Sequence, residues 1–173
     1  MGSGVQVLGR RQLEYGPCEG AQADVVHVHL LRRDGRVVLF RRSGNADHWG
    51  PVSGVIEPGE GAVEAAAREV AEETDLKIVV GDIVQTGLMF PALSPGSRRP
   101  LRIQVLTAFL RPSFCSRAVH LQEELNEFRI LEVANAKKLL TLRGTREGLC
   151  GLEFFMNARN VGTGQPVFLN RSE

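Results

Sequence analysis

Residues 54–76 read GVIEPGEGAVEAAAREVAEETDL, and they carry the clearest structural signal in this chain of 173 residues. A glycine, Gly54, is followed by Glu60 and then by the run REVAEE at residues 68–73. Apolar residues recur with the period of an α-helix between positions 61 and 74, which predicts a helix there. The face that this helix packs on the core is predicted to consist of Ala62, Val63, Ala66, Ala67, Val70 and Ala71.

Three glutamates of this segment are spaced for a common task. Glu69, Glu72 and Glu73 stand at positions i, i+3 and i+4, so on a helix they share an arc of about 100°. We expect this arc to point away from the alanine-rich face. Like charges so close repel one another, and a hard divalent cation would relieve that repulsion. The alternative is a solvated face in which Glu64, Arg68 and Glu72 form an i, i+4 ladder.

The pattern resembles the Nudix box, which reads glycine, five residues, glutamate, seven residues, then R-E-U-x-E-E-x-G-U, where U is a bulky aliphatic residue. Every defined position matches except Asp75, which stands where the family has glycine. The resemblance implies an α/β protein, specifically a Nudix-type α/β/α sandwich with a mixed sheet. We expect residues 1–173 to form one domain, with the first four residues disordered or vector-derived.

The resemblance also implies roles for the box residues. It implies that the three helix glutamates, Glu69, Glu72 and Glu73, bind Mg²⁺, with Mn²⁺ as a substitute. It implies that the backbone carbonyl of Gly54 adds a further ligand. Hydrolysis of a diphosphate needs such cations to neutralise the phosphate oxygens and to position a water molecule.

Two other box positions are expected to support the structure. The resemblance implies that Glu60 and Arg68 pair and brace the loop against the helix. Asp75 should adopt the left-handed backbone conformation that glycine favours, which aspartate tolerates at a small cost in stability. The alternative is a distorted helix end that misplaces Glu72 and Glu73.

A further acidic residue is expected downstream of the box. Residues 123–129, EELNEFR, resemble the E-H-x-E-[FY]-x-W stretch of Nudix members that cleave triphosphates. Alignment on Phe128 places the family's metal ligand or general base at Glu124, with Glu127 as second choice. Leu125 and Ile130 replace the family's histidine and tryptophan. The alternative for Glu124 is an exposed acidic loop.

Several residues outside the box are candidates for contact with the substrate. The resemblance places Arg42 where many members hold a substrate phosphate, which a guanidinium suits, although solvation of a strand end explains it equally well. Trp49 and Phe90 could stack on a base, or could simply pack. His27 and His29 share one face of a strand, but Mg²⁺ prefers oxygen ligands, so we favour a cleft or core position over a metal pair.

The remaining elements are predicted from turn signals and periodicity. Two apolar runs flank Asp34-Gly35 and predict a β-hairpin. Pro, Ser and Arg are frequent at residues 91–100, which predicts a loop. We expect strands at residues 25–31, 36–42, 78–84, 101–110 and 128–131, and further helices at 132–140 and 145–157, the last weakened by Gly148 and Gly151.

The composition is that of an ordinary globular protein, with 43% hydrophobic and 24% charged residues. A net charge of +1 gives no overall bias toward nucleic acid or anionic membrane. No apolar run approaches the ~18 residues that span a bilayer. The three cysteines, Cys18, Cys115 and Cys150, form no CxxC pair, so we expect reduced thiols and a cytoplasmic location.

These observations predict a Mg²⁺-dependent pyrophosphohydrolase in which water attacks phosphorus in a diphosphate linkage. The string from Trp49 to Glu60 resembles the W-x-x-V-[ST]-G variant of Nudix pyrophosphatases that act on pterin or nucleoside triphosphates. We therefore expect a small-molecule substrate such as a nucleoside triphosphate or dihydroneopterin triphosphate, and no nucleic-acid polymer or membrane partner. The resemblance also allows a homodimer.

Other functions stay open. Pro91, fifteen residues past the box, is compatible with an ADP-ribose or nucleotide-sugar pyrophosphatase. A Nudix-fold isomerase would need a cysteine just upstream of the box, and none is present. A catalytically silent Nudix-fold binding module would keep the fold without the acidic ligands, whereas here the REVAEE run is complete.

Overall fold

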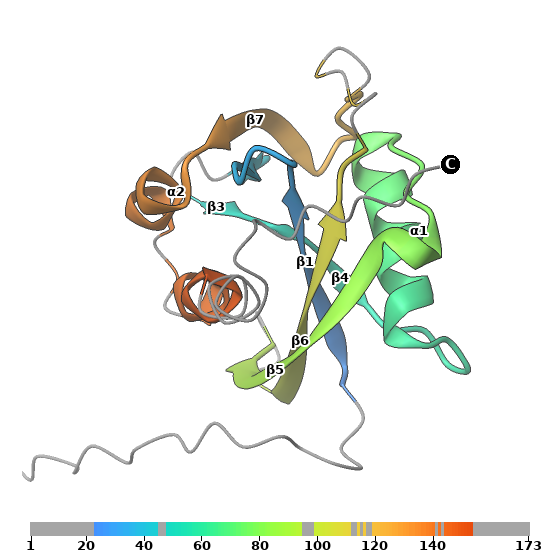
Figure 1. The fold of residues 1–173 in the computed structure, drawn as a ribbon. Helices are drawn as coiled ribbons and strands as arrows, with labels where there is room; N and C mark the ends of the chain where they lie inside the picture. The colour runs from blue at the N-terminus through green and yellow to red at the C-terminus, as the bar shows by residue number, and fades with distance from the viewer. Residues whose placement is uncertain are drawn as a thin grey trace, which may run out of the picture.

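A seven-stranded mixed sheet with helices on both sides forms the structure, a computed structural model (Figure 1). It describes residues 23–44, 48–94, 99–111, 114, 116, 119–140, 142 and 144–153. The strands are β1 (Val25–Leu31), β2 (Val37–Arg42), β3 (Trp49–Gly50), β4 (Val52–Val55), β5 (Ile83–Leu93), β6 (Pro100–Phe109) and β7 (Leu125–Leu131). The helices are α1 (Ala62–Thr74), α2 (Val133–Leu139) and a helix at residues 144–153, with a short 3₁₀ helix at Val80–Asp82.

Strand β1 lies at the centre of the sheet. It pairs in parallel with β6 along its whole length, and every other pairing is antiparallel. On its other side the first half of β1 pairs with β4, with Val25 opposite Val55, and its end pairs with β2, with Leu31 opposite Val37. This register fixes Gly54, on β4, at the point where the chain leaves the sheet for α1.

Separate hydrophobic clusters cover the two faces of the sheet: one lies beneath α1, and the opposite face has a larger one and a smaller one, the latter formed by Phe90, Ile103 and Val105. On β1, Val26, Val28 and Leu30 belong to the core beneath α1, where Ala66 and Val70 are fully buried. The opposite core gathers residues of β1, β2, α2 and the helix at 144–153, namely Leu31, Val37, Leu39, Ala136, Leu140, Leu149 and Leu152. Side chains of a strand alternate between faces, so this division confirms the predicted α/β/α sandwich.

The hairpin and the box helix follow the sequence closely. Strands β1 and β2 meet as predicted, and Gly35 in the turn has a positive φ of +81°. Helix α1 begins at Ala62, one residue after the predicted start. Its buried face includes Ala65, which the predicted stripe omits, while Ala71 is only half-buried.

The region after α1 differs from the prediction. No strand begins at residue 78: Val79 and Val80 are each 50% exposed, and Val80 begins the 3₁₀ helix. Strand β5 instead extends to Leu93, through Pro91, which was expected in a loop. Proline lacks the N–H that a central strand needs, and β5 lies at the edge of the sheet, where that loss is tolerated. Strand β7 likewise starts earlier than predicted, at Leu125.

Glycines in the last described helix permit close packing. A Cβ on Gly148 would lie 3.3 Å from Cγ2 of Val105, and a Cβ on Gly151 would overlap the side chain of Leu88. The residues that weaken helix formation therefore let the helix approach the sheet. Predicted helical residues 154–157 lie outside the described part, as do Cys18 and Cys115, while Cys150 is a free thiol. Among the described residues, no helix has the length and apolarity to cross a bilayer.

Candidate active site

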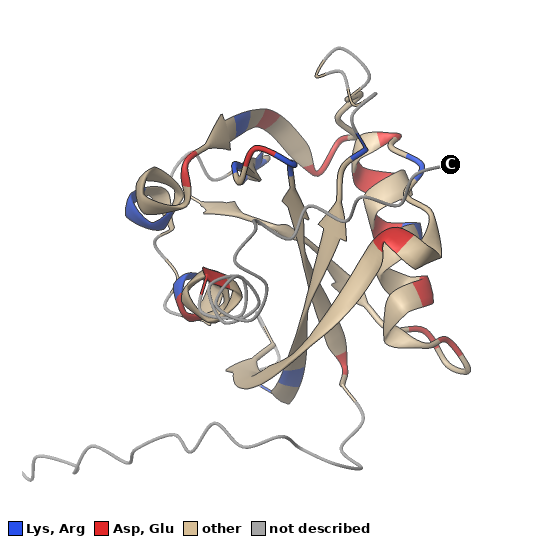
Figure 2. Ribbon diagram, viewed as in Figure 1, with Lys and Arg blue, Asp and Glu red and all other residues tan. Residues whose placement is uncertain are grey.

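Arg68 organises the first half of the box. Its Nη1 donates to Oε1 of Glu69 at 2.7 Å and to Oε2 of Glu72 at 3.0 Å, and its Nε donates to Oε1 of Glu60 at 2.9 Å. Its Nη2 also donates to the carbonyl of Val55 at 2.9 Å. The predicted Glu60–Arg68 pair is thus present. We call Arg68 with Glu60, Glu69 and Glu72 the Arg68 cluster, and it ties the loop to the helix. Acidic positions recur along α1 and in the loop that precedes it (Figure 2).

The charges of this cluster stabilise one another. The guanidinium of Arg68 lowers the pKa of Glu60, and a hydrogen bond from the backbone N–H of Glu57 adds to this effect. The pKa of Arg68 is raised in turn, chiefly by Glu60. Both groups therefore stay charged over the whole physiological range.

Gly54 lies directly against the carboxylate of Glu69. A Cβ at this position would overlap the carboxyl carbon and both carboxylate oxygens of Glu69. The absence of a side chain at Gly54 therefore lets the glutamate reach the backbone of β4. The Glu69 side chain is only 13% exposed as a result.

A second arginine joins distant parts of the chain. Nη1 of Arg42 donates to Oε1 of Glu73 at 3.0 Å and to Oε2 of Glu124 at 2.9 Å, while its Nη2 donates to Oγ of Ser53 at 2.6 Å. We call these four residues the Arg42 cluster. It unites the end of β2, the end of α1, strand β4 and the turn before β7. Ser53 occupies the [ST] position of the W-x-x-V-[ST]-G pattern, but it was not predicted as a site residue from the sequence.

Backbone hydrogen bonds hold the turn with Glu124 in place. The N–H of Gln122 donates to the carbonyl of Glu73 at 3.1 Å, and the N–H of Ser43 donates to the carbonyl of Glu124 at 2.8 Å. The first-choice residue Glu124 therefore lies beside the box, although 72% of its side chain is exposed. The second choice, Glu127, pairs instead with Arg41 at 2.9 Å and Arg129 at 2.8 Å.

Glu73 differs from the other box glutamates because it is buried. The residue is 4% exposed, and its Oε2 is buried with no hydrogen-bond partner among the described residues. Burial raises the pKa of Glu73 to about 7, although the nearby Arg42 opposes this rise. The expectation that all three glutamates point away from the core is therefore wrong for Glu73. Arg42 supplies a charged partner at the edge of the core, which makes this burial tolerable.

The box glutamates are divided between the two arginines rather than turned to one point. Among the described residues, no group of three or more His, Cys, Asp or Glu side chains is arranged around a common metal position. Yet five carboxylates share only two guanidinium groups, which leaves an excess of negative charge. Carboxylate oxygens are the ligands that Mg²⁺ prefers, and the unpartnered Oε2 of Glu73 is one of them. The chemistry of the donor set therefore fits a hard divalent cation.

The end of α1 is regular despite the departure from the box pattern. Asp75 has φ 60° and ψ 9°, the left-handed conformation that was predicted for it. Its N–H donates to the carbonyl of Ala71 at 2.9 Å and closes the helix. Helical residues continue to Thr74, so Glu72 and Glu73 keep their helical spacing.

The two aromatic candidates are both buried. Trp49 is 6% exposed, and the guanidinium carbon of Arg129 lies 4.6 Å above its ring. Phe90 is also 6% exposed, and its ring meets His27 edge-on at a centroid distance of 5.6 Å. These contacts support the packing role that was the alternative for each.

The two strand histidines are neutral. His29 is fully buried, and burial lowers its pKa to about 4. Burial also lowers the pKa of His27 to about 3, with smaller contributions from the charges of His29, Arg42 and His48. Both ring nitrogens of His29 lack a hydrogen-bond partner within the described residues.

Comparisons with known proteins show what the chain is similar to. The family profile described as NUDIX domain matches residues 21–147. The chain is 38% identical over 74 residues to an RNA pyrophosphohydrolase of Sphingopyxis alaskensis, a match that covers 42% of each protein. It is 43% identical over 44 residues to the dihydroneopterin triphosphate diphosphatase of Escherichia coli, which covers 25% of this chain and 29% of that one.

A solved structure resembles the fold over a longer range. The dihydroneopterin triphosphate pyrophosphohydrolase of E. coli superposes with a TM-score of 0.64 and 22% sequence identity, covering 84% of this chain and 99% of that one. At this identity the likeness concerns the fold. The family profile, which spans most of the sequence, shows that the chain belongs to the Nudix hydrolase family. The chain nevertheless spans less than half the length of the curated relatives it matches.

Proposed function

We propose that this protein is a Mg²⁺-dependent pyrophosphohydrolase that cleaves a diphosphate linkage by attack of water at phosphorus. One observation carries the proposal: five carboxylates, three of them from the second half of α1, gather around only two guanidinium groups. A solvated acidic helix would leave all of its glutamates in water. Here Glu69 is pressed against Gly54, and Glu73 is buried.

Residues of the two arginine clusters would have different roles in the reaction. Glu69, Glu72, Glu73 and Glu124, with the carbonyl of Gly54, would hold the cation. When bound, the cation neutralises charge on the diphosphate and lowers the pKa of bound water. Arg68 and Glu60 would keep the loop and the helix together while cation and substrate bind, because the Glu60–Arg68 pair does not involve the end of α1.

Arg42 would act on the substrate. Its guanidinium already binds carboxylate oxygens of Glu73 and Glu124, and it has the planar geometry that suits two phosphate oxygens equally well. A phosphate that takes the place of these carboxylates would release them for the cation. The charge on Arg42 would then stabilise the phosphate during attack.

Proton transfer completes the reaction. Glu72, Glu73 or Glu124 accepts the proton as the water oxygen forms its bond to phosphorus, and the bridging P–O bond breaks. For a nucleoside triphosphate cut between the first and second phosphates, the products are a nucleoside monophosphate and pyrophosphate.

We place a nucleoside triphosphate or dihydroneopterin triphosphate first among substrates, since one relative of that activity matches in sequence and in fold. The 5′-triphosphate end of RNA is a second candidate, because the matched relatives include RNA pyrophosphohydrolases. ADP-ribose and nucleotide sugars come next. We expect a cytoplasmic enzyme, which could act as a homodimer.

A hydrolysis screen tests the proposal. The full chain is incubated with nucleoside triphosphates, dihydroneopterin triphosphate, 5′-triphosphorylated RNA, ADP-ribose and nucleotide sugars, with Mg²⁺ or with EDTA. Products are then identified by mass. We expect Mg²⁺-dependent cleavage of a diphosphate bond in at least one of the triphosphates. If none of these compounds is cleaved, the result would favour a catalytically silent binding module. An isomerised diphosphate among the products would favour an isomerase.

A further inference from the structure

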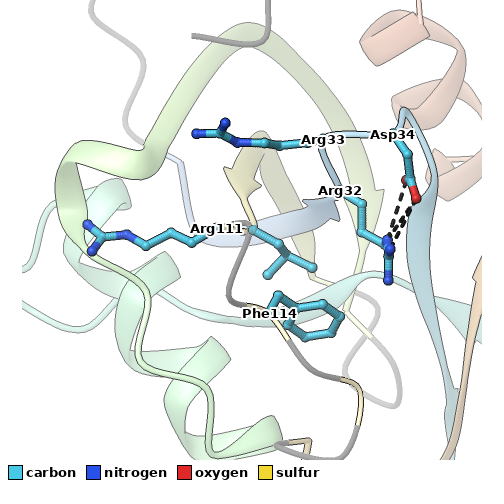
Figure 3. A pocket seen from close by; sticks show the side chains of 6 residues that line it. Arg32, Arg33, Asp34, Arg111 and Phe114 are labelled. Atoms are coloured by element: carbon cyan, nitrogen blue, oxygen red, sulfur yellow. Dashed lines mark hydrogen bonds and ion pairs between the residues drawn. The ribbon is translucent and has the colours of Figure 1, made fainter. Parts of the chain in front are cut away.

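A pocket away from the box lies where β1 and β6 end side by side (Figure 3). Two segments form it: the turn after β1 and the residues that follow β6. The N–H of Leu110 donates to the carbonyl of Leu31 at 2.8 Å and joins these segments. The cavity measures about 180 Å³ and is lined by Arg32, Arg33, Asp34, Leu110, Arg111 and Phe114.

Positive charge is concentrated around this pocket. The whole chain carries a net charge of only +1, yet four arginines meet two aspartates here. Arg32 and Arg36 both pair with Asp34, at 3.1 and 2.6 Å, and Arg111 pairs with Asp82 at 2.8 Å. Shared partners leave the local charge positive, so the pocket attracts anions.

Arg33 has a guanidinium that is free for a ligand. The residue is exposed, and it makes no hydrogen bond or ion pair within the part of the chain that the structure describes. In Figure 3, Arg33 and Arg111 extend in the same direction, whereas Arg32 turns to Asp34. Two guanidinium groups thus reach out from the ends of two neighbouring strands.

Phe114 and Leu110 give the pocket an apolar wall. The ring of Phe114 lies 5.9 Å from the guanidinium carbon of Arg32, on the inner side of the pocket. Guanidinium groups bind phosphate oxygens, and an aromatic ring offers a surface for a nucleobase. Together they match a ligand in which a phosphate and a flat ring occur side by side.

We propose that this pocket is a second binding site, which takes the phosphate of a nucleotide unit on Arg33 and Arg111 and its base against Phe114. The nucleotide is either free or part of a single-stranded RNA chain. The site goes beyond the proposed hydrolysis, and binding there requires no turnover.

Equilibrium binding to the full chain tests the proposal. A fluorescent hexauridylate is titrated in EDTA, so that the metal-free carboxylates of the box repel it, and its anisotropy is followed at several salt concentrations. Arg33→Ala should weaken binding about fivefold and reduce the slope of log affinity against log salt by about one. Arg33→Ala/Arg111→Ala should weaken it further, and Phe114→Leu should weaken it without changing the slope.

Arg102→Ala is the matched control, because Arg102 is an exposed arginine near the opposite end of β6. It should leave affinity and slope unchanged. Arg33 has no partner to lose, so Arg33→Ala should also keep the melting temperature of the native chain. This single variant therefore tests the site even if Arg111→Ala, which breaks the pair with Asp82, perturbs the fold.

Competition identifies the source of the phosphate. Displacement of the hexamer by AMP at equal nucleotide concentration supports a free nucleotide, and resistance to AMP supports an RNA chain. Inorganic phosphate should compete less well than AMP, because it lacks the ring. The proposal is overturned if Arg33→Ala/Arg111→Ala binds hexauridylate with the affinity and salt slope of the native chain. It is equally overturned if Arg102→Ala weakens binding as much as Arg33→Ala does.

Discussion

The Arg68 cluster and the Arg42 cluster both pair an arginine with glutamates of α1, but they are built differently. All members of the Arg68 cluster lie within residues 60–72, and their spacing follows from one loop and one helix. The Arg42 cluster joins residues 31 and 82 positions apart. The first cluster is thus a local brace, whereas the second exists only once the whole sheet has formed.

This difference between the clusters distinguishes residues that support the structure from residues that would take part in the reaction. In the Arg68 cluster each of the three carboxylates pairs with Arg68, and this pairing fixes the loop. The Arg42 cluster contains a buried glutamate with an unpartnered oxygen and an exposed glutamate on a turn. Unsatisfied groups of this kind are costly for stability, and they occur where a ligand completes them. We therefore assign the phosphate contact to Arg42 and the bracing to Arg68 and Glu60. Glu69 and Glu72 of the Arg68 cluster would hold the cation together with the two glutamates of the Arg42 cluster.

Glu73→Gln should have the largest effect. The amide keeps the size of the side chain but removes the charge that would bind the cation, so turnover should fall about 10²- to 10⁴-fold with the fold intact. Steady-state hydrolysis and thermal unfolding check this. Glu60→Gln in the Arg68 cluster is the comparison, and it should lower the free energy of unfolding by about 1 kcal/mol with a much smaller loss of turnover. Equal losses of turnover in both variants would erase the distinction between the clusters.

His29→Leu tests a buried group that, unlike either cluster, has no charged partner. The pKa of His29 is 6.5 in the unfolded chain and about 4 in the fold. Between pH 6.5 and 4 the unfolded chain therefore binds a proton at His29 that the folded chain does not bind. The free energy of unfolding falls as the pH drops through this range, by about 3 kcal/mol for this residue. The variant should lose that part of the pH dependence in chemical unfolding, whereas replacing the exposed His120 should not. Parallel pH profiles for His29→Leu and the native chain would contradict this.

Gly54→Ala probes the contact between strand β4 and the Arg68 cluster. The added Cβ overlaps the end of the Glu69 side chain, which is flexible and can move at little cost. Stability should change by less than about 1 kcal/mol, while metal affinity and turnover should fall about 10- to 100-fold. Gly50→Ala is the control, since its Cβ would meet nothing within 4 Å. Full activity in Gly54→Ala would mean that the contact between the Glu69 carboxylate and the backbone at Gly54 is not required for turnover.

Asp75→Gly should have the smallest effect. Asp75 is the one described residue other than glycine with a positive φ, and glycine adopts that conformation without strain. The replacement should raise the free energy of unfolding by about 0.5 kcal/mol and leave turnover unchanged, whereas Asp75→Ala should lower it by about 1 kcal/mol. Denaturant titration measures both. If the native chain were more stable than Asp75→Gly, the Asp75 side chain would stabilise the fold by more than its backbone strain destabilises it.

The same comparison explains what the sequence could predict. The box, its Glu60–Arg68 pair and the left-handed Asp75 depend on neighbours along the chain, and all three are present as predicted. The hairpin at Gly35 also follows from local turn chemistry. The sandwich follows from the alternating strands together with the family resemblance.

Long-range packing accounts for what the sequence did not predict. The buried Glu73 of α1 pairs with Arg42 of strand β2, and the guanidinium that lies over Trp49 belongs to Arg129, eighty positions away. Strand β5 passes through Pro91 only because it lies at the edge of the sheet, and that place is set by the topology. None of these contacts can be predicted from the spacing of residues in the sequence.

Titration of the full chain with Mn²⁺, followed by the loss of the free-ion EPR signal, tests the central claim most directly. We predict that the native chain binds Mn²⁺ and that Mg²⁺ competes for the same site. Binding should weaken at least about tenfold in Glu73→Gln and stay unchanged in Glu64→Gln, whose side chain is exposed on the same helix. If Glu69→Gln/Glu72→Gln/Glu73→Gln bound Mn²⁺ as tightly as the native chain, these glutamates would not be the metal site.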